Sequence, residues 1–152
     1  MSAENTALVR RWIKEVWSKG NLDAVDELVA PSYANHDPVA PMPESGREGF
    51  KKHVTEYRTA FPDLAFTIDD VLGEGHKVTV RWTAHGTHKG TLLGNIQPTG
   101  KEVTTTGTSI LRIAGGKVAE EWVHWDALGM MQQLGVVPML GEPRGKTASA
   151  KR

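Results

Sequence analysis

The chain of 152 residues contains no cysteine. This absence excludes a disulfide scaffold, thiolate zinc sites, iron–sulfur clusters and a cysteine nucleophile. Any chemistry must therefore come from carboxylates, histidines, hydroxyls or a bound cofactor. The length suits a single domain with one sizeable core, so we look for one site.

The sequence also lacks long apolar runs and an excess of one charge. No apolar stretch approaches the roughly 20 residues of a membrane helix, and the N-terminus lacks the pattern of a secretion signal. We therefore expect a soluble, cytoplasmic protein with no membrane partner. Basic and acidic residues number 18 each. Four basic residues lie beyond position 143, so the remaining chain is mildly acidic, which argues against a nucleic-acid partner.

Helical periodicity dominates the first part of the chain, where apolar residues between positions 8 and 17 recur on one face. The pattern predicts a first helix up to Gly20, a second over 22–29, an extended loop over 31–43 and, after a capping-box pattern at Ser45 and Glu48, a third helix ending before Pro62.

From residue 64 onward apolar and polar residues alternate, which is typical of strands. Two strands over 102–113 and 117–125 are joined by a Gly-Gly turn, and a short helix follows. Helices followed by hairpin-linked strands predict the α+β class, with a curved, mostly antiparallel sheet that encloses a pocket. We expect one domain over 1–140 and a disordered basic tail over 141–152.

The segment around Trp122 and Asp126 suggests acid–base chemistry. In a regular strand Trp122, His124 and Asp126 share a face. If that face points inward, the indole would desolvate the carboxylate and raise its pKa, as a general base near neutral pH requires. Alternatively, Asp126 only caps the helix that starts at Ala127. Glu120 lies on the same face, which counts against a fully buried position.

Two further groups of side chains are candidates for the site. His88 ends a strand whose apolar face includes Trp82, so it could donate a hydrogen bond to a substrate oxygen; a satisfied strand-end histidine is the alternative. His85 falls on the opposite face, so we expect no metal site here. Asn35, His36 and Asp37 lie in the extended loop, either as an Asx-type turn or as a polar cluster at a pocket mouth. Trp82 belongs either to the core or to the binding surface.

Several short motifs follow one another between residues 5 and 137. They are Asn35-His36-Asp37-Pro38, Phe61-Pro62-Asp63-Leu64, Gly86-Thr87-His88-Lys89-Gly90, Pro98-Thr99-Gly100-Lys101, Arg112 through Gly116-Lys117, Glu121-Trp122, Asp126-Ala127-Leu128-Gly129 and Gln132-Gln133-Leu134-Gly135. In these motifs and in their order the chain resembles the SnoaL-like polyketide cyclases, or ester cyclases, of the nuclear-transport-factor-2-like superfamily.

The resemblance implies a cone-shaped curved mixed sheet wrapped around N-terminal helices, an apolar pocket, and a homo-oligomer, either dimer or tetramer. It also implies an intramolecular aldol ring closure of an apolar carbonyl ligand without metal or cofactor, with Asp126 as acid and base. The enolate oxygen then needs donors, for which His88, His36 and Trp122 are candidates. We expect Trp82, Asn35 and His124 to complete the binding surface. The family's histidine on the strand before the closing hairpin is missing, because this chain has Ile110 and Arg112 there.

Two other functions are compatible with the sequence. A pocket protein of this fold could bind a small molecule without catalysis. Hydrolysis by an activated water, as in epoxide hydrolases that share the fold, would need a second acid and an arginine beside Asp126. Glu120 and Arg112 are the sequence candidates for those roles.

Overall fold

We describe residues 2–42 and 44–141 of a computed structural model. The elements in chain order are α1 (Ser2–Trp12), the π-helix η1 (Ile13–Ser18), α2 (Asp23–Leu28), β1 (Val29–His36), α3 (Gly46–Ala60), β2 (Ala65–Glu74), β3 (Lys77–Thr87), β4 (Glu102–Ala114), β5 (Lys117–Trp125) and α4 (Ala127–Leu134). Within these ranges no helix is both long and apolar enough to cross a membrane. Residues 142–152 of the predicted tail lie outside the described residues.

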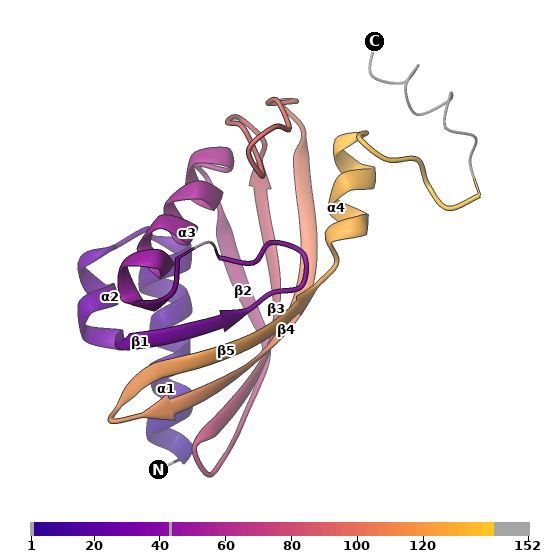
Figure 1. The fold of residues 1–152 in the computed structure, drawn as a ribbon. Helices are drawn as coiled ribbons and strands as arrows, with labels where there is room; N and C mark the ends of the chain where they lie inside the picture. The colour runs from indigo at the N-terminus through magenta and orange to yellow at the C-terminus, as the bar shows by residue number, and fades with distance from the viewer. Residues whose placement is uncertain (1, 43, 142–152) are drawn as a thin grey trace.

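The five strands form one mixed sheet in the order β1-β5-β4-β3-β2. Strand β1 runs parallel to β5, and the other neighbours are antiparallel. Figure 1 shows the sheet strongly bent, with α1, α2 and α3 together on one side and α4 beyond the end of β5. The predicted α+β class, with N-terminal helices and a curved mixed sheet, is therefore confirmed.

The core lies between the inner face of this sheet and the helices. Val9 and Trp12 of α1 and Phe50 and Val54 of α3 are almost fully buried, and they meet inward residues of every strand from β3 to β5. Burying side chains of this size stabilises the fold by roughly 1.5–3 kcal/mol each before the entropy cost of ordering them. The spacing of these residues by three or four is what made the helices predictable.

Three local features differ from the sequence pattern. The first helix continues as η1, whose wider turns the periodicity does not indicate. Residues 29–36 form an edge strand where we expected a helix end and a loop, because an edge tolerates the missing N–H of Pro31. Ser45 takes the N-cap position of α3 without a side-chain cap bond, so the predicted capping box is wrong in that detail.

One extra residue in β5 decides which face of this strand points inward. Ile113 pairs with Val118, but the next pair joins Arg112 to Glu120, so Ala119 is a bulge. Val118 and Ala119 are both buried although they are neighbours in the chain. Because strand side chains alternate, each β5 side chain beyond the bulge lies on the face opposite to that predicted by unbroken alternation.

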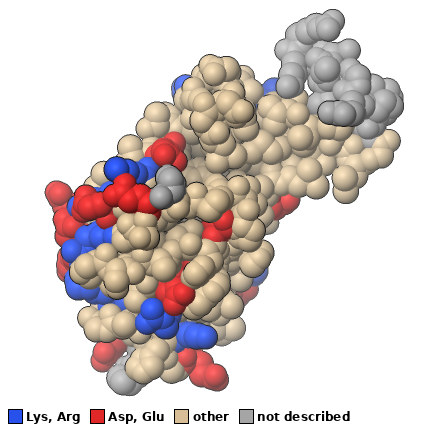
Figure 2. All heavy atoms as spheres, in the orientation of Figure 1, with Lys and Arg blue, Asp and Glu red and all other residues tan. Residues whose placement is uncertain are grey.

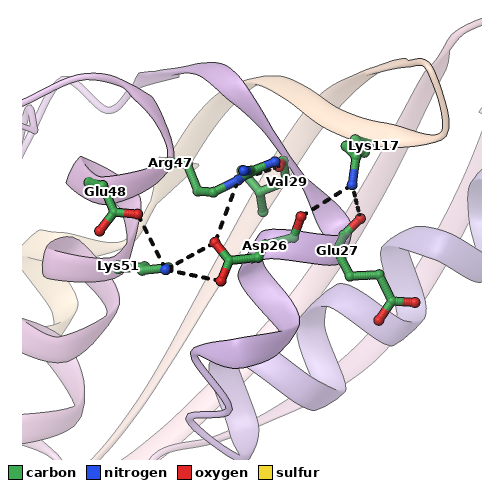
Figure 3. A network of polar contacts seen from close by, with 7 residues as sticks. All are labelled: Asp26, Glu27, Val29, Arg47, Glu48, Lys51 and Lys117. Atoms are coloured by element: carbon green, nitrogen blue, oxygen red, sulfur yellow. Dashed lines mark hydrogen bonds and ion pairs between the residues drawn. The ribbon is translucent and has the colours of Figure 1, made fainter.

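A polar network outside the core ties α2 to its neighbours (Figure 3). Lys51 of α3 contacts Asp26 at 3.0 Å, and the Arg47 guanidinium donates to the Val29 carbonyl oxygen at 2.7 Å. The Lys117 ammonium donates to backbone carbonyl oxygens at the end of α2, the C-terminal position where a cation is favourable. In Figure 2 the charged side chains gather around the helical side, and the opposite end of the visible face is mostly uncharged.

Candidate functional site

A mostly apolar cavity opens between the inner face of the sheet and the helices. Its apolar walls are formed by Trp12, Ile13, Trp17, Phe61, Leu64, Phe66, Trp82, Ala84, Val103, Val123, Trp125 and Met130. The polar residues of the lining are Asn35, Asp37, His53, Tyr57, His85, Thr105, Ser109 and Glu121. Apolar walls with a few placed polar groups are typical of small-molecule sites.

Strand β5 presents Glu121 and Val123 to this cavity, followed by Trp125. The prediction that Trp122 and His124 point inward with Asp126 is therefore wrong. Its physical reason is the bulge at Ala119, which reverses the alternation of the strand.

Asp126 is exposed and is not among the residues that line the cavity. Its Oδ1 accepts a hydrogen bond from the Gly129 backbone N–H at 2.9 Å, so the side chain caps α4. This arrangement agrees with the alternative that the sequence left open. The acid–base role predicted for Asp126 therefore loses its support from desolvation by Trp122.

Histidines predicted for the site lie elsewhere. His88 is fully buried behind the cavity lining, where its ring packs on Phe61 and Nδ1 accepts from the Thr99 backbone N–H at 3.2 Å. His36 lies outside, where Nε2 contacts a Glu120 carboxylate oxygen at 2.7 Å. The His36 ring stacks on Trp122, with the ring centroids 5.3 Å apart.

His124 is exposed on the outer face of the sheet. Asn35 and Trp82, by contrast, line the cavity as expected. Their binding roles stay predictions.

Asp37 brings a carboxylate to the cavity wall just after β1 and is only 6% exposed. Its Oδ1 accepts from the backbone N–H groups of Val39 and Ala40 at 2.9 and 3.3 Å. Its Oδ2 accepts from Trp125 Nε1 at 3.0 Å. Three donors therefore stabilise a negative charge at this position.

His53 and Tyr57 enter the cavity from α3, one helical turn apart. His53 is 8% exposed, and burial lowers its pKa below the usual 6.5, while the charge of Asp37 acts in the opposite direction. Its imidazole is therefore neutral at neutral pH. The two rings meet edge to face with centroids 5.2 Å apart.

The Tyr57 hydroxyl is buried and has no hydrogen-bond partner among the described residues. Burial raises the pKa of Tyr57, so the hydroxyl keeps its proton and remains a donor. Its ring also meets Trp125 edge to face, at 6.3 Å between centroids. We call Asp37, His53 and Tyr57 the proton-transfer cluster.

A second polar group lies around Glu121, which is 5% exposed. Its Oε1 accepts from the Tyr33 hydroxyl at 2.8 Å and from Asn35 Nδ2 at 3.3 Å. Burial raises the pKa of this carboxyl, against the effect of hydrogen bonds from Tyr33 and Ser109. Ser109 also accepts from Trp82 Nε1 at 3.1 Å, which extends the network across the sheet.

The helical spacing of apolar and aromatic residues in α3 is a sequence signal for His53. Phe50, His53, Val54 and Tyr57 recur at helical spacing and form the inner face of α3. A titratable residue on such a face is buried against the core and has a perturbed pKa. Glu121 gave no comparable signal, because its inward position depends on the bulge.

The chain was compared with protein-family models and with known proteins. The model described as SnoaL-like polyketide cyclase matches residues 7–134. The aklanonic acid methyl ester cyclase DauD of Streptomyces sp. (strain C5) is 32% identical over 84% of this chain and 80% of its own length. The nogalonic acid methyl ester cyclase of Streptomyces nogalater is 28% identical over 78% of this chain and 89% of its own.

A solved structure extends the similarity to three dimensions. TsrD from Streptomyces laurentii superimposes with a TM-score of 0.79 and is 28% identical, covering 89% of this chain and 97% of TsrD. The family match covers more than half of the chain and extends from within α1 to the end of α4. The chain belongs to the SnoaL-like polyketide cyclase family.

Proposed function

We propose that this protein closes a ring by intramolecular aldol addition within a carbonyl compound held in the cavity, with His53 as the base. The observation that carries the proposal is a neutral, buried histidine in an apolar cavity, beside a carboxylate and a tyrosine hydroxyl that has no partner in the described part of the chain. A base must be deprotonated at working pH, and a buried imidazole satisfies that condition.

The reaction needs one proton to move twice. The imidazole of His53 takes a proton from a carbon that two carbonyl groups already acidify, and an enolate forms. The enolate carbon then bonds to a second carbonyl carbon of the same molecule. The oxygen of that carbonyl becomes an alkoxide and receives the proton back from His53. The product is therefore an isomer of the substrate, and the enzyme returns to its starting state.

The neighbours of His53 fit the charges that develop in this reaction. The fixed Asp37 carboxylate favours the imidazolium that forms after proton abstraction. The Tyr57 hydroxyl is a donor for the enolate oxygen, and it acts where little water competes. The apolar walls favour a folded substrate in which the carbanion approaches the carbonyl.

The substrates in the relatives' names suggest the first assay. Aklanonic acid methyl ester and nogalonic acid methyl ester would each be incubated with the protein and analysed by chromatography with mass detection. We expect a product with the mass of the substrate, formed by the wild type and not by His53→Gln. Binding of these esters without any isomer would instead identify a non-catalytic binding protein and would overturn the proposal.

The hydrolase alternative has less support. Arg112 Nε donates to Glu120 Oε1 at 3.0 Å, and neither residue lines the cavity. The cavity contains no arginine among its lining residues within the described chain. A homo-oligomeric state and a cytoplasmic location stay predictions.

A further inference from the structure

Strands β1 and β5 bring three polar side chains together in the wall of the cavity. Asn35 pairs with Glu121 in the parallel register, and Tyr33 lies two residues before Asn35 on the same face of β1. Tyr33 is fully buried, and its hydroxyl donates to Glu121 Oε1 at 2.8 Å. The three side chains hydrogen-bond to one another, so few of their polar atoms remain available for other partners.

The network determines which way the Asn35 amide points. Its Nδ2 donates to the Tyr33 hydroxyl oxygen at 2.9 Å and to Glu121 Oε1 at 3.3 Å. The only proton of the Tyr33 hydroxyl is given to Glu121, so its oxygen accepts from Asn35 and the amide nitrogen must face it. A flipped amide would place its oxygen against two acceptors.

The amide oxygen of Asn35 takes no part in this network. Oδ1 is buried and has no hydrogen-bond partner among the described residues. Asn35 nevertheless lines the cavity. A buried acceptor without a donor is destabilising, so a bound molecule that supplies the donor removes this cost and binds more tightly.

We propose that Asn35 Oδ1 accepts a hydrogen bond from a hydroxyl of the substrate, and that Glu121, acting through Tyr33, is the positioning residue that keeps this oxygen available. The aromatic walls and this amide oxygen together select a flat, apolar carbonyl compound that carries a phenolic or enolic hydroxyl. The inference rests on the proposed function in that it concerns the same cavity. Asn35 is proposed to recognise the substrate, whereas His53 is proposed to transfer the proton.

The experiment compares two probes that differ in one donor. 2-Naphthol carries a hydroxyl, and 2-fluoronaphthalene has a fluorine of similar size that cannot donate. Both dissociation constants are measured by quenching of tryptophan fluorescence, and their ratio reports the hydrogen bond. Because this ratio needs no turnover, it tests the hydrogen bond to Asn35 independently of the cyclase chemistry proposed for His53.

We expect the preference for 2-naphthol to fall by about three- to tenfold in Asn35→Leu, which lacks the acceptor. Glu121→Leu leaves Tyr33 without its acceptor and the amide free to turn, so we expect a similar fall. Glu121→Gln retains an oxygen that accepts from Tyr33 and should keep most of the preference. A purely structural role would lower both affinities together and leave the ratio unchanged.

Glu120→Gln is the matched control, because Glu120 is next to Glu121 in the chain but its carboxylate lies outside the cavity. This variant should show the same ratio of dissociation constants as the wild type. Circular dichroism of each variant establishes that it is folded, and Glu121→Gln supplies a second measurement if Glu121→Leu fails to fold. An unchanged ratio in Asn35→Leu, or no saturable binding of either probe to the wild type, would overturn the proposal.

Discussion

Replacing Tyr57 by phenylalanine should make the protein more stable and less active. The variant removes one oxygen and keeps the ring that packs against His53 and Trp125. That oxygen is buried without a partner among the described residues, and an unsatisfied buried polar group costs about 1–3 kcal/mol. Taking the lower end of this range, we expect the free energy of unfolding to rise by about 1 kcal/mol. In a chain of this length, that is a rise of about 2–4 °C in Tm.

The same change should cost activity, because the hydroxyl is the proposed donor to the enolate oxygen. Loss of one such donor lowers kcat by about 100-fold or more. Urea denaturation and the ring-closure assay measure the two effects. Tyr33→Phe is the matched control, since its hydroxyl is hydrogen-bonded to Glu121 and Asn35 and its loss should destabilise the protein. A Tyr57→Phe variant that is less stable than the wild type, or fully active, would refute the reasoning.

Three further outcomes follow from the same contacts. Activity should fall on the acid side with a midpoint below pH 6.5, because burial lowers the pKa of His53 and the neutral form is the base; a kcat/KM profile with its midpoint above 6.5 would contradict this. Trp125→Phe removes the Nε1 donor to Asp37 and should cost about 1.5 kcal/mol in urea denaturation, whereas no loss would show that the bond contributes nothing. In Gly107→Ala the added Cβ would clash with the Trp82 ring, so we expect the free energy of unfolding to fall by about 1–3 kcal/mol and ligand binding to weaken; an unchanged urea midpoint would argue against this packing.

The sequence was sufficient for most of the fold, because periodicity reports which side chains are buried. The apolar residues of α1 and α3 recur at helical spacing, and the alternation in β3 and β4 matches their burial. The π-turns of η1 and the strand pairing of β1 were not predictable in this way. Both depend on neighbours that are distant in the sequence.

The site was harder to predict because it depends on one inserted residue. Ala119 has a side chain that is compatible with either face, so nothing in the sequence marks the bulge. Without it, Glu120 would pair with Leu111 and the alternation would direct Trp122 and Asp126 inward. Trp82 was found because β3 keeps a regular alternation next to the cavity, whereas Asn35 was predicted from its polar neighbours in an expected loop.

The central claim is that the proton-transfer cluster in the cavity, rather than exposed Asp126, moves the proton. Turnover numbers of His53→Gln and Asp126→Asn, measured in parallel on the ester that the wild type converts, test this most directly. We expect His53→Gln to lose about 100- to 10,000-fold, as removal of a general base does, and Asp126→Asn to stay within a few-fold of the wild type. An inactive Asp126→Asn together with an active His53→Gln would contradict the account.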